Sequence, residues 1–187
     1  MKNKHSFVKT IFLTIVLGAG AATYASDFRD ASWGMSLRDV LALHPGELPA
    51  DRKIGYLTYD SKLANLDVKI FYRFDSDDQL SEAGYLFMTE DREDVVLEDY
   101  ERLNDLLRKR YPSAAQSEKT WSNDLFQDKP EEWARAIRVG HLVIHWEHED
   151  TGSLITHSLT GTRREVTHIL SYTAAMGESL DSVLDQL

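Results

Sequence analysis

A cluster of imidazole and carboxylate side chains lies between His141 and Asp150, where polar residues alternate with apolar ones. Successive side chains of a β-strand point to opposite faces, so His141, His145 and Glu147 would share one face of a strand. The opposite face would carry Leu142, Ile144 and Trp146. The alternation therefore predicts a strand with one polar and one apolar face.

The two hairpins that follow this strand bring in a third imidazole. If the tight turn after the strand sets the pairing, Ser158 lies opposite His145, and a second turn at Arg163 places His168 beyond Ser158. Backbones two strands apart are separated by about 9–10 Å, a gap that a metal ion between long side chains can bridge. Imidazole and carboxylate groups suit zinc, so His145, Glu147 and His168 form a candidate Zn²⁺ site. The alternative is a half-solvated sheet face that carries these polar residues outward.

No other part of the sequence carries a recognisable catalytic motif. The sequence has no Gly-x-Ser-x-Gly segment, no cysteine and no glycine-rich phosphate loop. The acid pairs Asp77-Asp78 and Glu131-Glu132 fall in an expected turn and at an expected strand entry, where solvated carboxylates are ordinary. These observations favour a protein that is not an enzyme.

Two aromatic residues in the connector at 113–130 are candidates for binding a partner. Trp121 and Phe126 interrupt an otherwise polar stretch, and aromatic side chains are typical anchors of protein interfaces. The alternative is that both side chains pack against the body of the protein, which would make the connector part of the fold.

The first half of the chain predicts a short helix followed by strands. Ser36 can cap a helix that begins at Leu37, with Asp39 in the acidic position of a capping box. Strands are expected at 54–59, 66–74 and 80–88. The second of these strands alternates, with Leu66, Val68, Ile70, Tyr72 and Phe74 on one face.

The second half of the chain repeats the order of helix and strands. An acidic run at 90–94 suits the positive end of a helix dipole. The apolar residues that follow it recur at helical spacing: Val96, Tyr100, Leu103 and Leu107. Strands are expected at 133–139, 142–149, 154–160 and 166–172.

These elements predict an α+β fold in a single domain, residues 26–177, with an antiparallel sheet covered on one face by helices. Residues 27–90 and 91–175 would form two similar halves, each a helix followed by an antiparallel meander. Residues 178–187 have the composition of an acidic C-terminal tail.

The first 25 residues have the features of a secretory signal peptide. Three lysines give a positive start, residues 11–22 form an uncharged run, and small residues precede an expected cleavage after Ala25 or Ala22. The run is too short to span a bilayer, which takes about 20 apolar residues. The mature protein is therefore expected in the periplasm or secreted, without a membrane span, and the lack of cysteine excludes a lipid-modified cysteine as an anchor.

The charge balance narrows the class of partner. Without the first 25 residues, which hold three lysines and no acid, the chain carries 18 basic and 31 acidic side chains, a net charge near −13. Such a surface repels nucleic acid and anionic lipid head groups. It suits a basic protein partner or cations. The same acidic balance also keeps an exported protein soluble.

The stretch Trp33-Gly34-Met35-Ser36, followed by Val40, resembles the start of small exported bacterial modules. BamE-like outer-membrane assembly lipoproteins and the repeats of β-lactamase inhibitor proteins have a similar helix start and a similar strand–turn–strand pattern. The resemblance implies an α+β fold. The chain lacks the lipidated cysteine of the first group and the disulfides of the second, so the resemblance assigns no functional residue.

Together these features predict a non-catalytic protein-binding or inhibitor-like module of the periplasm. Two alternatives stay open. One is a metal-binding protein or metal-dependent enzyme that uses His145 and His168, and the other is a carrier of a small apolar ligand held between helix and sheet.

Overall fold

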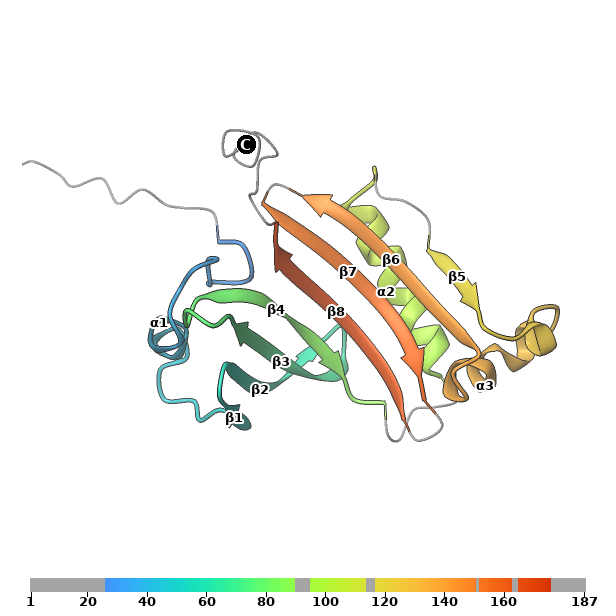
Figure 1. Ribbon diagram of the computed structural model, residues 1–187, viewed down its shortest axis with the longest axis horizontal. Helices are drawn as coiled ribbons and strands as arrows, with labels where there is room; N and C mark the ends of the chain where they lie inside the picture. Colours follow the sequence, from blue (N-terminus) through green and yellow to red (C-terminus); the bar gives the residue numbers. More distant parts are fainter. Residues whose placement is uncertain (1–25, 90–94, 114–116, 151, 163–164, 176–187) are drawn as a thin grey trace, which may run out of the picture.

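The computed structural model describes residues 26–89, 95–113, 117–150, 152–162 and 165–175, which form an α+β fold around one antiparallel sheet (Figure 1). Within these residues the sheet has eight strands: β1 (Asp51–Lys53), β2 (Tyr56–Leu63), β3 (Leu66–Phe74), β4 (Leu80–Phe87), β5 (Glu118–Trp121), β6 (Leu142–Asp150), β7 (Ser153–Gly161) and β8 (Val166–Ala174). The same residues form the helices α1 (Leu37–Ala42), α2 (Val96–Arg110) and α3 (Trp133–Arg138) and the 3₁₀ turns η1 (Asp124–Phe126) and η2 (Pro130–Glu132). The α+β class with an antiparallel sheet is confirmed.

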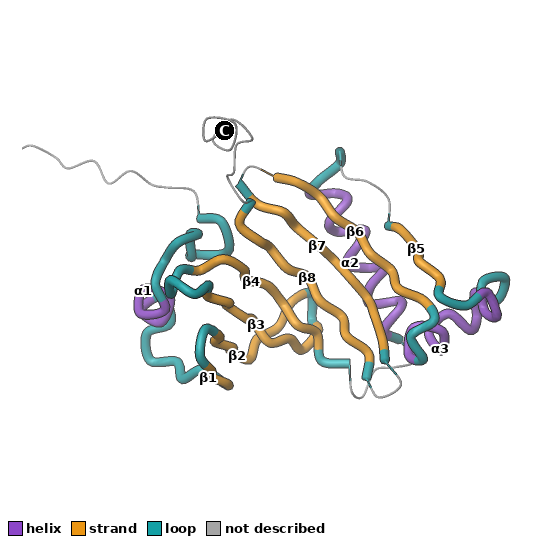
Figure 2. The backbone as a smooth tube through the Cα atoms, viewed as in Figure 1, coloured by secondary structure: helices purple, strands orange, loops and turns teal. Residues whose placement is uncertain are grey.

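The strands run in two meanders that meet in the middle of the sheet. Their order is β1-β2-β3-β4-β8-β7-β6-β5, so the last strand of the chain pairs with β4. Six residue pairs, from Glu82–Thr173 to Phe87–His168, join β4 to β8. Figure 2 shows β1–β4 crossing the view at an angle to β6–β8, as the twist of a large sheet requires. The short strands β1 and β5 form the two edges.

The helices pack against one face of the sheet. Val40 of α1 shares a core with Ile70 of β3, and Leu103 of α2 shares a core with Leu170 of β8. Ile70 and Leu170 lie on the same face because both pair with Tyr85 of β4. α3 joins the core over β6 and β7. In Figure 1, α2 lies behind β6 and β7, and the other face of these strands is turned to the viewer.

Local sequence signals explain where α1 begins and which side of α2 is buried. The Ser36 hydroxyl accepts the Asp39 N–H at 3.3 Å, and the Asp39 carboxylate accepts the Ser36 N–H at 3.3 Å. The predicted capping box is thereby confirmed. The four apolar residues predicted for the long helix are all buried in α2: Val96, Tyr100, Leu103 and Leu107.

The segment 133–139 forms α3 and not the predicted strand. Pro130 opens a 3₁₀ turn and two glutamates follow it, a composition that suits the start of a helix. α3 then buries the consecutive residues Ala136 and Ile137, which a strand would point to opposite faces. The fourth strand of the second meander is instead β5, inside the connector, where the sequence predicts none.

Gly84 lets β4 and β8 approach closely where the two meanders join. A Cβ atom at this position would overlap the Leu170 carbonyl oxygen and would lie 2.8 Å from the Phe71 ring. Phe71 pairs with Gly84 and is only 2% exposed, although it points away from the helices. Its ring also stacks against Tyr56 at a centroid distance of 6.2 Å. An aromatic ring thus covers the glycine at the junction.

We expect Gly84→Ala to lower the free energy of unfolding by roughly 3 kcal/mol, the upper end for overpacking, because the obstructing atom belongs to the backbone. Gly152→Ala is the matched control, since Gly152 has a φ of +76° but no neighbour near its missing Cβ. Its cost is backbone strain alone, about 1 kcal/mol. Urea unfolding of both variants measures the difference, and an equal loss would contradict a close approach at Gly84.

Three sequence features lie outside the described residues: the predicted signal peptide at 1–25, the acidic run at 90–94 and the acidic tail at 178–187. Among the residues that the structure describes, no helix is long and apolar enough to cross a membrane.

Candidate functional site

In the described part of the chain, no helix covers the second face of the sheet, the open face. Its side chains form three rows that cross the strands. The first row is Glu118, His145, Ser158, Ile169, Leu86, Lys69 and Asp60. The second row is Glu147, Thr156, Ser171, Gly84, Phe71 and Thr58, and the third is Glu149, Leu154, Thr173, Glu82, Arg73 and Tyr56. Because the first row crosses seven strands, the open face is one continuous surface.

The part of the open face on β5–β8 is acidic. Its charged residues are Glu118, Glu147 and Glu149, and these strands place neither lysine nor arginine on this face. The imidazole of His145 lies on the same face, with its Nε2 3.3 Å from the Glu147 carboxylate. Three carboxylates near one sheet edge therefore produce a negative potential that no lysine or arginine on this face of β5–β8 offsets.

The part of the open face on β2–β4 is charge-compensated. Lys69 Nζ lies 2.7 Å from the Asp60 carboxylate, and Arg73 lies 2.9 Å from the Glu82 carboxylate. The contrast between the two parts of the face shows that the acidity is local and does not simply follow from the net charge of the chain.

Between these charged areas the open face carries short hydroxyl side chains and a few aliphatic ones. The hydroxyls of Thr156 and Ser171 hydrogen-bond across β7 and β8 at 2.7 Å. The half-buried aliphatic residues of the face include Leu86, Leu154 and Ile169. This mixture of apolar and polar side chains is typical of non-obligate protein interfaces, which are about as apolar as an average protein surface.

The strand register separates the residues of the predicted zinc site. Ser158 lies opposite His145, as predicted, but its partner on β8 is Ile169, while His168 pairs with Leu159. His168 therefore points to the helix side and His145 to the open face. The structure brings His145 and Glu147 together and leaves His168 on the opposite side of the sheet.

The observed pairing of β7 with β8 differs from the predicted pairing by one residue. The β7–β8 ladder closes with Gly161 paired to Val166, so the connecting turn has an even number of residues. A turn centred on Arg163, as predicted, would have an odd number. A one-residue shift turns every side chain of a strand to the other face. Among the described residues, no three His, Cys, Asp or Glu side chains are grouped to hold a metal ion.

His168 instead forms a buried imidazole pair with His157. Their Nε2 atoms lie 2.9 Å apart, and the two residues are 1% and 0% exposed. His168 stacks on Phe87 at a centroid distance of 4.1 Å, and His157 stacks on Tyr100 of α2 at 4.1 Å. Only one of the two Nε2 atoms can carry a proton in this hydrogen bond, so the two rings cannot both be charged.

Burial lowers the pKa of both imidazoles, and repulsion from His168 lowers the pKa of His157 further. The sequence analysis overlooked His157. Its position on the apolar face of β7, between Ile155 and Leu159, is the signal that could have identified it as a buried histidine.

The two aromatic residues predicted to bind a partner pack against the fold. Phe126 is 5% exposed and lies in the core beneath α3. Trp121 is half-buried at the end of β5, and its ring meets Trp133 edge-on at a centroid distance of 6.0 Å. Trp121 pairs with Leu142 of the core, so its side chain lies on the helix side and not on the open face.

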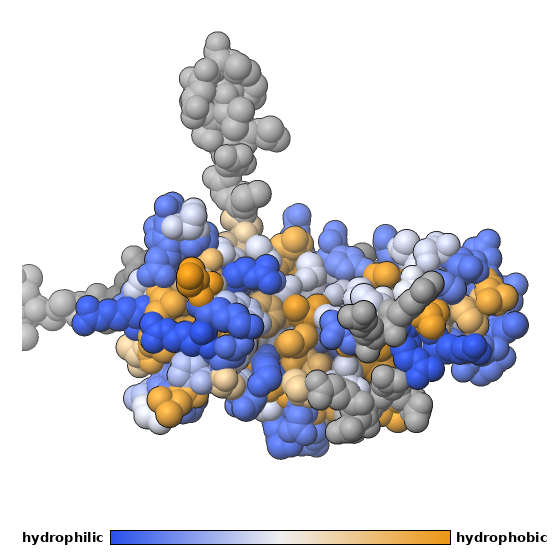
Figure 3. Space-filling model, turned by 60° about the horizontal axis from the view of Figure 1, so that its bottom comes forward, coloured by the Kyte–Doolittle hydropathy of each residue, from blue (hydrophilic) through white to orange (hydrophobic). Residues whose placement is uncertain are grey.

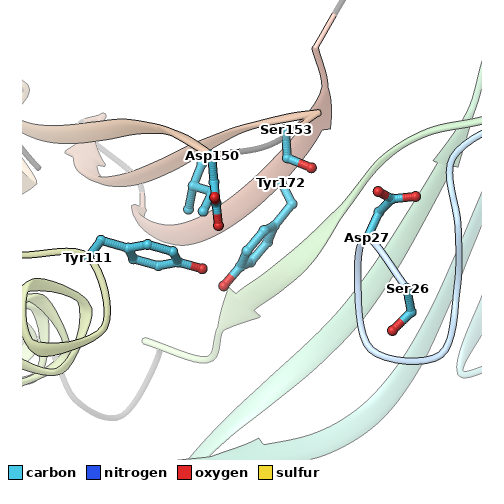
Figure 4. A pocket seen from close by; sticks show the side chains of 7 residues that line it. Ser26, Asp27, Tyr111, Asp150, Ser153 and Tyr172 are labelled. Carbon is cyan, nitrogen blue, oxygen red and sulfur yellow. The ribbon is translucent and has the colours of Figure 1, made fainter. Parts of the chain in front are cut away.

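A polar pocket of about 340 Å³ lies on the helix side, at the end of the β6–β7 hairpin (Figure 4). The Asp27 carboxylate accepts the Trp33 backbone N–H at 2.8 Å, and the Ser153 hydroxyl accepts the Trp33 indole N–H at 3.0 Å. Burial and a hydrogen bond with Tyr111 raise the pKa of Tyr172. These contacts fasten the N-terminal segment to the sheet, which is a structural role for the polar groups of the pocket.

Acidification is expected to destabilise the fold through the imidazole pair. Because the folded-state pKa values lie below the ordinary value of 6.5, the unfolded chain binds more protons below that pH, and stability falls as the pH falls. Between pH 7 and pH 5 we expect a loss of about 2 kcal/mol for each imidazole, measured by urea unfolding.

The half-exposed His145 supplies the control, since His145→Asn should leave this pH dependence unchanged. Nuclear magnetic resonance of the imidazole protons gives a second reading that needs no variant. Titration of His157 or His168 near pH 6.5 in the folded protein would disprove the buried neutral pair.

No family model, no curated protein and no solved structure matches this chain. A function for the protein must therefore be inferred from its own geometry, in which the open face is a broad surface that no described helix covers.

Proposed function

We propose that this protein is a non-catalytic recognition module that binds a basic protein partner through the open face, in the periplasm after export. The observation that carries the proposal is a sheet face without a helical cover in the described residues, whose β5–β8 part bears carboxylates and no lysine or arginine. The signal-peptide pattern of residues 1–25 supports export.

The size of the open face suits a protein partner. Seven strands at the usual spacing extend over roughly 29 Å. A standard interface buries about 800 Å² on each partner, which corresponds to a patch of about 28 Å on a side. The face is therefore wide enough for a specific protein contact.

The charge distribution supports a basic partner. Glu118, Glu147 and Glu149 lie towards the β5–β6 edge, and the acids of the other meander are already paired. Complementary charges raise the association rate and exclude wrong partners.

The proposal includes two similar halves, residues 27–90 and 91–175. The strand order supports this, since each meander runs from an edge strand to the centre, and a helix precedes the main strands of each. The resemblance of the segment at Trp33 to exported bacterial modules supports an inhibitor-like role for the open face.

Photo-crosslinking in cells that export the full chain tests this proposal. A crosslinking amino acid at Thr160, on the open face, should give adducts with a partner protein. The double variant Glu147→Lys/Glu149→Lys should reduce the adduct yield roughly tenfold, because it replaces attraction by repulsion.

The matched control is Glu98→Lys/Glu131→Lys, which makes the same change in net charge at exposed acids of α2 and η2. A crosslinker at Arg102 on α2 reports contacts of the helix side. Equal adduct yields from Thr160 and Arg102, or equal losses in the two double variants, would argue against recognition by the open face.

A further inference from the structure

An apolar groove of about 230 Å³ runs beside α2 on the helix side of the sheet. Five leucines line it: Leu63, Leu103, Leu106, Leu107 and Leu170. Leu106 is 47% exposed, one of the few large apolar side chains that the described residues leave in water. α2 therefore leaves part of its apolar side uncovered where it faces the β2–β3 hairpin.

The lining of the groove includes a cation. Arg110 lines the groove and makes no ion pair with any described residue, and its guanidinium carbon lies 5.9 Å from the centre of the Tyr111 ring. Tyr85 and Tyr172 also line the groove. Burial raises the pKa of both tyrosines, so their hydroxyls stay protonated, and that of Tyr172 already has a hydrogen bond with Tyr111.

The lining of the groove also includes a residue in a strained backbone conformation. Ala64, at the turn of the β2–β3 hairpin, lines the groove with a φ of 50°, and Asn65 follows with a φ of 67°. This two-residue turn favours glycine or asparagine at both positions. An alanine here places a small apolar side chain at the groove where a less strained asparagine would place a polar one.

We infer that the groove binds a free, monomeric fatty-acid-type ligand, with its hydrocarbon chain along the leucines and its carboxylate on Arg110. The volume equals that of about eight water molecules, which limits the enclosed part to a chain of medium length. Arginine suits a carboxylate because its planar guanidinium donates two parallel hydrogen bonds. The inference does not depend on the function proposed for the open face, which lies on the other side of the sheet.

Two other occupants fit the observations less well. A second copy of the chain would need an interface of at least about 1,000 Å², and Leu106 is the one largely exposed leucine among the groove residues. Figure 3 shows hydrophobic areas interspersed with hydrophilic ones on the face in view. Binding to a membrane surface scales with the apolar area that the protein inserts, and Leu106 is the one largely exposed leucine that the groove offers.

Calorimetric titration of the purified mature chain with three ten-carbon probes tests the inference: decanoate, decanol and decyltrimethylammonium, all below their aggregation concentrations. Decanoate should bind roughly tenfold more tightly than decanol, because only the carboxylate gains a charged hydrogen bond with arginine. The cationic probe should bind most weakly.

Two variants separate the chain contact from the charge contact. Leu106→Glu should weaken decanoate roughly tenfold by placing a charge in the groove, whereas Leu125→Glu changes another exposed leucine, 60% exposed, and should have no effect. Arg110→Gln should remove the preference for decanoate over decanol, whereas Arg52→Gln removes the same charge from β1 and should leave it intact. None of these changes should alter crosslinking from the open face.

Three results would overturn the inference. The first is decanoate binding that is no tighter than decanol binding or that is insensitive to Leu106→Glu. The second is flotation with phosphatidylglycerol vesicles without binding of monomeric decanoate, which would show a membrane contact. The third is a dimer in sedimentation experiments that Leu106→Glu dissociates, which would show a second copy on the groove.

Discussion

The backbone ladder between β4 and β8 is the interaction on which the rest of the structure depends. Six residue pairs and the close approach at Gly84 join two meanders that would otherwise each present a bare central edge. Because the ladder is continuous, side chains from both meanders line up in rows, and one face can be shared by helices from both parts of the chain. The open face exists only because this junction holds.

Polar groups are distributed differently on the two sides of this junction. On the helix side, His157 and His168 are sealed between aromatic rings and have only each other as hydrogen-bond partners at Nε2. On the open side, carboxylates face solvent, and the buried Ser171 hydroxyl is paired with Thr156. Burying a polar group requires a partner, so the helix side is restricted to few and specific polar contacts, whereas the open side is free to vary in charge and to serve recognition.

The sequence predicts those elements whose periodicity is strong and fails where a turn length decides the outcome. Alternation from Leu66 to Phe74 identifies β3, and helical spacing identifies α2, because both patterns reflect burial on one side. No comparable sequence pattern reveals the length of the turn between Gly161 and Val166. Whether this turn has an odd or an even number of residues determines which face of the sheet His168 occupies. The difference in charge between the two parts of the open face also depends on the strand register. It can be recognised only once the structure shows which residues lie opposite one another.

The edge of the sheet at β6 has a consequence for self-association. β5 pairs only with the first four residues of β6, from Leu142 to His145, so the rest of that edge is unpaired by any described strand. Exposed edges invite pairing with another chain. Two copies joined there in antiparallel fashion would bring Glu147 and Glu149 of one close to the same residues of the other, and like charges across a strand pair repel. The carboxylates thus keep an incomplete sheet edge from growing into a larger sheet.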